Sequence, residues 1–376
     1  MQTLHERIFR NALERHFFYF YRRIFTIQEI ENNSILQWVF GASILSYFLA
    51  FHAYINSATI TIDTYLRGEH LCWPYFQSCG EWYFLRALPF GYSQTFLYMF
   101  LFGTFALIIY LMHRKEWVLA HMLLTISFLW HATVAFVLTY SVAGNYDYYL
   151  GIFTLILLFL PHKEFFLKLA FVLLYFLSTA TKIHETWIVG TYFSALKTGL
   201  PLFPDWSIPI WTNLVMFMEM VAGWFLLSSK KVLQRSVFFF FVAFHLYSGL
   251  LVEYRYPGTV MPTLLILFGP FYRPTPIPFD WKSIGGWVLV VLMCMGQATS
   301  HFIPGDEKLT LEGNKFGLYM FEANHQCISH IEVVYPDGGV RKFDYETSSA
   351  RARCDPYRYW FPTKTTCERN RALIAN

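Results

Sequence analysis

Three ionisable side chains lie inside or at the end of strongly apolar stretches of the sequence. Lys182 closes the stretch that begins at Tyr175, Glu219 lies in the middle of a second stretch, and His245 in the middle of a third. Hydrocarbon solvates charge poorly, so each group is costly there without a partner. If the three met, a desolvated lysine could act as a base beside a carboxylate and an imidazole. The structural alternative is a snorkelling lysine and buried hydrogen bonds that join helices.

The composition predicts a membrane protein. Hydrophobic residues make up 55% of the 376 residues, aromatic residues 20% and charged residues only 14%. A typical soluble chain carries about 25% charged residues. The formal net charge is +4, and the basic residues gather in short loops instead of one patch, so nucleic acid is excluded as an expected partner. The expected partners are the lipid bilayer and molecules dissolved in it.

Nine apolar segments are predicted to be membrane-spanning helices. The fourth and the eighth are the shortest and fall well below the roughly 20 residues that a perpendicular helix needs, so the prediction is eight or nine spans. The predicted fold is an all-α polytopic membrane protein with a small, partly β extracytoplasmic C-terminal domain. The segments cover residues 37–56, 95–112, 117–140, 148–161, 164–181, 209–227, 236–255, 259–272 and 284–300.

The basic residues predict the orientation of the chain. They precede the first segment and follow the second, fourth, sixth and eighth, which makes those loops and the N-terminus cytoplasmic. No cleavable signal peptide is expected, because residues 1–35 are polar and arginine-rich. The expected location is a bacterial inner membrane with the C-terminal domain in the periplasm. The basic residues are Arg7, Arg10, Arg15, Arg22, Arg23, Arg114, Lys115, His162, Lys163, Lys230, Lys231, Arg235, Arg273 and Lys282.

Three regions follow from this pattern. Residues 1–35 are predicted to form a cytoplasmic interfacial amphipathic segment, and residues 36–300 the transmembrane domain. Residues 301–376 form the small extracytoplasmic domain. In it, two alternating runs at 331–335 and 340–345 flank a turn that contains Gly338, which predicts a β-hairpin. A domain of this size has little core, so disulfides or packing on the membrane domain must hold it.

Five of the six cysteines fall on the predicted outer side, where disulfides are permitted. Cys72 and Cys79 would close a tight loop, and two of Cys327, Cys354 and Cys367 could pair, with the third free or joined to the first loop. Their connectivity stays open at this point. The spacing of Cys72 and Cys79 is not a zinc-ligand pattern, and no metal is expected.

Histidines in or near the apolar segments raise the alternative of a haem between helices. His121 and His131 are about 15 Å apart along one helix, and no other helix repeats that spacing. Haem is therefore not the favoured interpretation. The histidines considered are His52, His121, His131 and His245.

The order of several short motifs resembles the membrane domain of the vitamin K-dependent gamma-glutamyl carboxylase, also called the HTTM (horizontally transferred transmembrane) family. The resemblance covers about residues 20–280. Its four segments are Tyr175 and Phe176 through Lys182 to Trp187; Glu219 with Ala222, Gly223, Leu226 and Leu227; Phe244 and His245 with Gly258 and Met261; and Asn145 with Tyr148, Gly151 and Phe153.

The resemblance implies a reduced quinone, like vitamin K hydroquinone, as cofactor. By it, Lys182 is the base that deprotonates the cofactor, and Asn145 orients the reacting oxygen. His245 and Tyr146 are further candidate catalytic residues, although Tyr146 stands where the family has histidine. Glu219, Trp187, Phe244 and Tyr175 would line the cofactor pocket. The family's large lumenal region is replaced here by the short tail, so the resemblance implies the fold more than carboxylation.

Three functions are compatible with these features. The first is a membrane enzyme that uses a lipid quinol and dioxygen, in the manner of an epoxidase or carboxylase, on an extracytoplasmic substrate. The second is a quinone/thiol redox module, which requires a reactive outer cysteine such as Cys327. The third is a non-enzymatic assembly or binding protein that shares the helical bundle and uses its tail for docking.

Overall fold

The computed structural model describes the helical part of the chain and pieces of its tail. The described residues are 12–56, 72–73, 75–79, 81–82, 93–137, 145–191, 193, 199–252, 255–303, 316–318, 327–335, 337–344, 354–357, 359–361, 363–364 and 367–368. Within these ranges the chain is mostly helical, and its sheet is one two-stranded hairpin. The expectation of a helical bundle with a small β element is confirmed.

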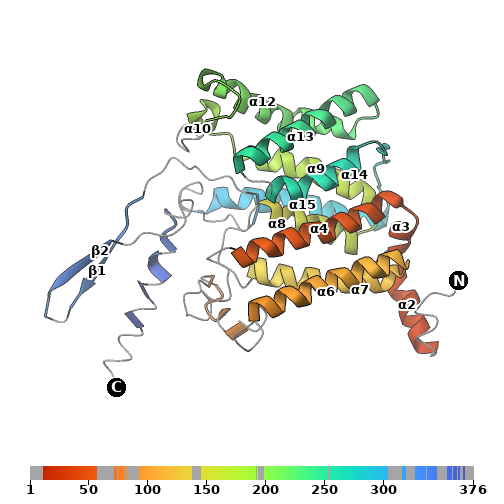
Figure 1. Ribbon diagram of the computed structural model, residues 1–376, viewed down its shortest axis with the longest axis horizontal. Helices are drawn as coiled ribbons and strands as arrows, with labels where there is room; N and C mark the ends of the chain where they lie inside the picture. Colours follow the sequence, from red (N-terminus) through yellow and green to blue (C-terminus); the bar gives the residue numbers. More distant parts are fainter. Residues whose placement is uncertain are drawn as a thin grey trace.

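A helix covers each of the nine apolar segments, and these helices lie roughly along one direction (Figure 1). Two described helices are long and apolar enough to cross a membrane, Trp117–Val137 and Trp281–Thr299. Helix length therefore does not support eight or nine spans. The nine are α4 Ser34–Asn56, α6 Ser93–His113, α7 Trp117–Ala132, α8 Asn145–Phe159, α9 Lys163–Ala180, α12 Ile208–Met220, α13 Lys231–Val252, α14 Arg255–Phe268 and α15 Ile284–Thr299.

Two of the predicted segments are not continuous α-helices. The third passes from α7 into the π-helix η2, Thr133–Val137, and the sixth passes from α12 into the 3₁₀ helix η4, Ala222–Leu227. A change in the number of residues per turn rotates the side chains that follow it. In η4, Ala222 and Leu226 face the core while Trp224 remains partly exposed. Hydropathy alone does not predict this change in the number of residues per helical turn.

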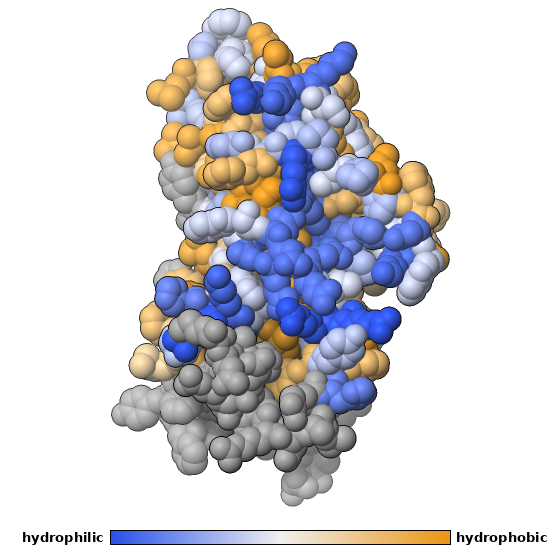
Figure 2. Space-filling view, turned by 90° about the vertical axis from the view of Figure 1, so that its right-hand side faces the viewer, coloured by the Kyte–Doolittle hydropathy of each residue, from blue (hydrophilic) through white to orange (hydrophobic). Residues whose placement is uncertain are grey.

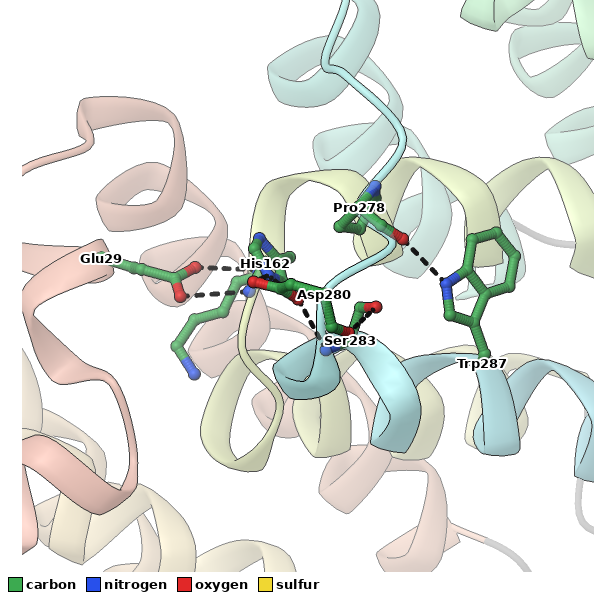
Figure 3. Close-up of polar contacts among 7 residues, drawn as sticks. Glu29, His162, Pro278, Asp280, Ser283 and Trp287 are labelled. Atoms are coloured by element: carbon green, nitrogen blue, oxygen red, sulfur yellow. Dashed lines mark hydrogen bonds and ion pairs between the residues drawn. The ribbon is translucent and has the colours of Figure 1, made fainter.

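The helix α9 lies at the centre of the bundle. It packs against α8, α12, α14 and α15, and its aromatic residues Phe171 and Tyr175 are fully buried. Its N-terminus is capped from outside: Glu29, on the short helix α3 (Ile27–Glu31), accepts hydrogen bonds from the backbone amides of His162 and Lys163 at 3.0 and 2.9 Å (Figure 3). Helix N-termini leave amides without partners, so this carboxylate satisfies two of them.

One end of the bundle, here called the polar end, collects the loops that the sequence marks as basic. It comprises α3 and the loops at residues 114–116, 160–163, 228–231 and 269–283. Contacts join these loops: His162 pairs with Asp280 at 2.9 Å, and the Tyr272 hydroxyl donates to the Ser228 carbonyl at 3.2 Å. Figure 2 views this end and shows a hydrophilic strip with hydrophobic residues on both sides. The basic loops therefore share one end of the bundle.

The opposite end carries the disulfide-bonded loop and the tail. Cys72 and Cys79 form a disulfide and pack against Val134 at the end of α7, together with Phe361 of the tail. The strands β1 (His330–Val334) and β2 (Val340–Asp344) pair antiparallel, with Val334 opposite Val340. This confirms the predicted hairpin, which stands away from the helices in Figure 1.

The N-terminal helix α2, Ala12–Ile24, is amphipathic, as predicted for residues 1–35. One side contacts α7, where the Tyr21 hydroxyl lies 3.0 Å from Nδ1 of His121. The other side leaves Phe17, Phe20 and Ile24 exposed. Such a second apolar side is typical of helices that lie at a membrane surface.

Candidate functional site

Lys182 and Glu219 form a buried ion pair. Lys182 lies just past the end of α9, and Glu219 lies in the last turn of α12. The Lys182 amine and the Thr179 hydroxyl both donate hydrogen bonds to Oε2 of Glu219. The two charged residues are only 6% and 2% exposed. Lys182 is therefore turned inward and is not a snorkelling anchor.

The ring of Trp187 lies against the amine of Lys182. After α9 the chain turns into the four-residue helix α10, Glu185–Ile188, which places the Trp187 ring 5.5 Å from the Lys182 amine. The indole nitrogen of Trp187 donates to the Thr212 carbonyl of α12 at 3.4 Å. An ammonium over an indole face is favourable. The turn therefore both positions and shields the amine.

His245, on α13, contacts α9 at Tyr175, on the helix face that also carries Thr179. Its Nε2 is hydrogen-bonded to the hydroxyl of Tyr175, and both side chains are fully buried. Phe241 packs on the Tyr175 ring with centroids 4.6 Å apart, and Phe244 lies 5.3 Å from the His245 ring. Tyr175 and Thr179, one helical turn apart on α9, carry the contacts to His245 and to Glu219, so the two pairs are neighbours along that helix. The structure thus brings together six of the eight sequence-predicted catalytic and pocket residues.

The remaining two, Asn145 and Tyr146, form the first turn of α8, but their side chains lie outside the described residues. The same helix reaches the site further along. Tyr149 is fully buried, and its ring lies 6.1 Å from that of Tyr175. The segment that carries the resemblance at Asn145 is therefore part of the helix that packs beside the Lys182 helix.

The groups in this cluster are of the types that can exchange protons and bind a small polar group. Lysine, carboxylate, hydroxyl, phenol and imidazole groups surround one buried region, and aromatic rings exclude water from it. Such groups can hold a proton or a hydroxyl-bearing ligand. A small internal cavity among the described helices lies elsewhere, between α4, α8 and α14, where Ser43, Ser46, Thr259 and Thr263 line it.

The described histidines do not converge on a haem. His121 contacts the Leu158 carbonyl at 3.0 Å, His131 lies 3.5 Å from Asp147, and His245 pairs with Tyr175. The side chain of His52 lies outside the described residues. Among the residues described, no group of three or more histidine, cysteine or carboxylate side chains could hold a metal ion. The interhelical haem alternative is therefore disfavoured by these histidine partners.

The cysteines form two disulfides, Cys72–Cys79 and Cys327–Cys354. Cys367 in the tail and Cys294 in α15 are free and exposed. This selects one of the pairings that the sequence left open. It also removes Cys327 as the free thiol that the redox-module interpretation requires.

The sequence reasoning missed a network at the polar end. Glu164 accepts hydrogen bonds from Lys168 at 2.6 Å, from Arg273 at 3.1 Å and from Asn33 at 2.6 Å. Lys168 also donates to the carbonyl of Arg273 at 2.7 Å. The i, i+4 spacing of Glu164 and Lys168 is the sequence signal that could have indicated their pairing. The network ties α9 to the N-terminal region and to the loop before α15.

A second contact at the polar end holds the loop before α15. His162 Nε2 lies 2.9 and 3.1 Å from the two oxygens of Asp280, whose Oδ1 accepts from the Ser283 amide at 3.0 Å, as Figure 3 shows. Desolvation raises the pKa of Asp280, but the hydrogen bonds from His162 and Ser283 outweigh it, and the net pKa is lowered. Asp280 thus caps the turn that starts α15.

Comparison of the chain with protein-family models, with curated proteins and with solved structures finds no match.

Proposed function

We propose that the chain is a polytopic integral membrane protein with eight or nine spans in a bacterial inner membrane. The polar end faces the cytoplasm, and the disulfides and the tail face the periplasm. The observation that supports this orientation is the separation of basic loops and disulfides to opposite ends of one bundle. Helices such as α8 and α14 are shorter than a bilayer and cross it by relying on neighbouring helices for burial.

Cys367 offers a direct test of this orientation, because it is an exposed free thiol of the tail. A membrane-impermeant maleimide added to intact spheroplasts should label Cys367, and the Cys367→Ser variant should lose that label. A cysteine introduced at Lys230, on the polar end, should react only after the membrane is opened. Labelling of position 230 from outside, or of Cys367 only from inside, would reverse the assignment.

Within this frame we infer that the protein binds a lipid quinol at Lys182 and Glu219 and acts with dioxygen on an extracytoplasmic substrate, as an epoxidase or carboxylase-like enzyme. The observation that carries the inference is the convergence of Lys182, Glu219 and the Tyr175–His245 pair from α9, α12 and α13. Structural pairs alone do not require four ionisable groups in one apolar region. The donor set fits the hydroxyl groups of a quinol ring, and the ring of Trp187 fits its flat face.

The residues have distinct tasks in this proposal. When the proton between the Lys182 amine and Oε2 of Glu219 sits on the carboxylate, the uncharged amine can accept a proton from a bound hydroxyl. Thr179 holds Oε2 in place, and the Tyr175–His245 pair orients a second oxygen of the ligand. Trp187 must move aside for access, since its ring lies over the amine. A bound hydroquinone would supply the reducing equivalents, and with dioxygen the strong base that no side chain provides.

The test is quinol consumption with dioxygen by purified protein in lipid nanodiscs. Wild type is compared with Lys182→Ala, and with Lys230→Ala as a matched control that removes an exposed lysine. Loss of turnover in Lys182→Ala alone supports the enzyme. A Lys182→Met/Glu219→Leu double variant, which removes the charges together, separates loss of the base from loss of the fold. A wild type without turnover on menaquinol, ubiquinol and vitamin K hydroquinone refutes the proposal.

A non-enzymatic assembly or binding role is the second candidate. It is favoured by the hairpin, which leaves Ile328 92% and Val334 69% exposed. A two-stranded hairpin is marginal by itself and gains stability from a partner. In this case Lys182 and Glu219 only join α9 to α12. The test is cross-linking of an extracytoplasmic partner to wild type and to a variant from which the hairpin is deleted. A partner recovered only with wild type, from a protein that shows no quinol turnover, would establish this role.

A further inference from the structure

His131 and Asp147 form a second buried pair, on the other side of the bundle from Glu219. His131 lies in the last turn of α7, and Asp147 lies in the first turn of α8. Nε2 of His131 is 3.5 Å from Oδ1 of Asp147, and the side chains are 0% and 4% exposed. A carboxylate and an imidazole so far from water are costly unless each compensates the other.

Phenol groups surround this pair on the adjoining helices. The Tyr47 ring of α4 packs edge-on against the His131 ring with centroids 5.3 Å apart. Tyr148 is a further phenol next to Asp147 in the first turn of α8. Tyr149, from the same turn of α8, is also fully buried. Tyr47, Tyr148 and Tyr149 are thus titratable side chains described near the pair, and phenols stay neutral over the range in which histidine and carboxylates titrate.

The backbone next to the pair is irregular. The π-helix η2 starts at Thr133, two residues after His131. Such π-bulges are uncommon and recur at functional sites, since the wider turn weakens the regular hydrogen-bond ladder. Val134 and Trp130 of this region pack beneath the Cys72–Cys79 loop. The pair thus lies under a disulfide-bonded cover at the end of the bundle that carries the tail.

We propose that His131 and Asp147 form a proton-exchange site that takes up and releases a proton at the outer face of the membrane. With one shared proton the pair is neutral whether the proton sits on Oδ1 or on Nε2. Binding one more proton gives a neutral carboxyl beside an imidazolium, and losing one gives a carboxylate beside a neutral imidazole. The ligand of this site is the proton itself.

The simpler interpretation is a helix cap, because an acidic residue in a first turn stabilises the helix dipole. An exposed carboxylate would serve that purpose without the cost of burial. The cap also gives no reason for the imidazole opposite or for the π-helix that follows it. This inference needs the proposed orientation of the chain, but it does not need a quinol.

The test is pH-difference infrared spectroscopy of the protein in proteoliposomes oriented with the tail outside, with the pH changed only outside. Wild type is expected to show the carbonyl band of a buried protonated carboxyl that changes with the external pH. Asp147→Asn should abolish that band, and His131→Gln should move the pH at which it appears. Asp205→Asn, which changes an exposed acid at the start of α12, is the matched control and should leave the band unchanged.

Asp147→Glu is a second variant that distinguishes loss of the carboxyl from misfolding. It keeps a carboxyl at this position, so its band should be present but shifted from that of wild type. A pH-dependent band that is as large in Asp147→Asn as in wild type, or that ignores His131→Gln, would overturn the proposal, as would a wild type without a pH-dependent band. The result is independent of quinol turnover. If the protein shows no quinol turnover but its carboxyl band still changes with pH, the proton-exchange site is supported and only the proposed enzyme activity is refuted.

Discussion

Replacing Lys182 with methionine leaves the Glu219 carboxylate buried without its countercharge. Glu219 is 2% exposed, and its other described hydrogen bond comes from the Thr179 hydroxyl. Breaking a buried ion pair by removing one partner costs about 3–5 kcal/mol. We therefore expect Lys182→Met to lower the free energy of unfolding by about that amount. Glu219→Leu should cost a similar amount, because it strands the ammonium and the Thr179 hydroxyl.

The double variant Lys182→Met/Glu219→Leu removes both charges and fills their space with apolar atoms. Such replacements are often neutral or stabilising, so the double variant should be more stable than either single variant. Single variants that each cost about 3–5 kcal/mol and a neutral double variant give a coupling energy of about 6–10 kcal/mol between the two sites, more than the roughly 0.5–3 kcal/mol usual for contacting residues. This non-additivity is the signature of a pair removed from water.

The assay is equilibrium unfolding in mixed micelles, followed by tryptophan fluorescence, for wild type, both single variants and the double variant. Lys230→Met, which changes an exposed lysine, should stay within about 0.5 kcal/mol of wild type. Single variants that each cost under about 1 kcal/mol and add in the double variant would refute the reasoning. They would mean that the Lys182 amine reaches water or lipid headgroups.

Three further predictions concern other parts of the chain. Replacing Cys72 and Cys79 with serine opens a loop with a sequence separation of 7 and should destabilise the protein by about 2.5 kcal/mol, measured by thermal unfolding. Because the Asp280 pKa is lowered, its contribution to stability is present above its ordinary pKa and lost as the pH falls through the lowered value; the protection of the amides at the start of α15, measured relative to their intrinsic exchange rate at each pH, should therefore fall at acid pH in wild type but not in Asp280→Asn. Gly286→Ala would place its Cβ 2.2 Å from the Phe166 ring and should cost about 1–3 kcal/mol in the same unfolding assay.

Hydropathy located the helices because burial in apolar surroundings dominates helix formation in such a chain. It did not predict where the winding changes. The passage from α12 to η4 occurs at Val221, within an uninterrupted apolar run, and the π-helix after Ala132 lies in another. These changes depend on how neighbouring helices pack, and no local propensity records that packing.

The sequence identified the candidate residues of the site but not the contacts between them. Lys182, Glu219 and His245 stood out because charged or polar groups are rare in apolar stretches. Their pairing follows from the crossing of α9 with α12 and α13, which brings together residues 37 and 70 positions apart. Asp147 was overlooked because it lies at the start of a helix, where an acidic residue has an ordinary local explanation.

The carboxylate of Glu29 has a consequence for the order of biosynthesis. It caps the start of α9, yet the amide that it binds belongs to a residue 133 positions later in the chain. At about 5–20 residues per second, a ribosome needs roughly 7–27 seconds to make that stretch. During this interval α4, α6, α7 and α8 are synthesised, and the Glu29 carboxylate does not yet have the α9 amides as partners. The N-terminal segment therefore closes the bundle late, although it is synthesised first.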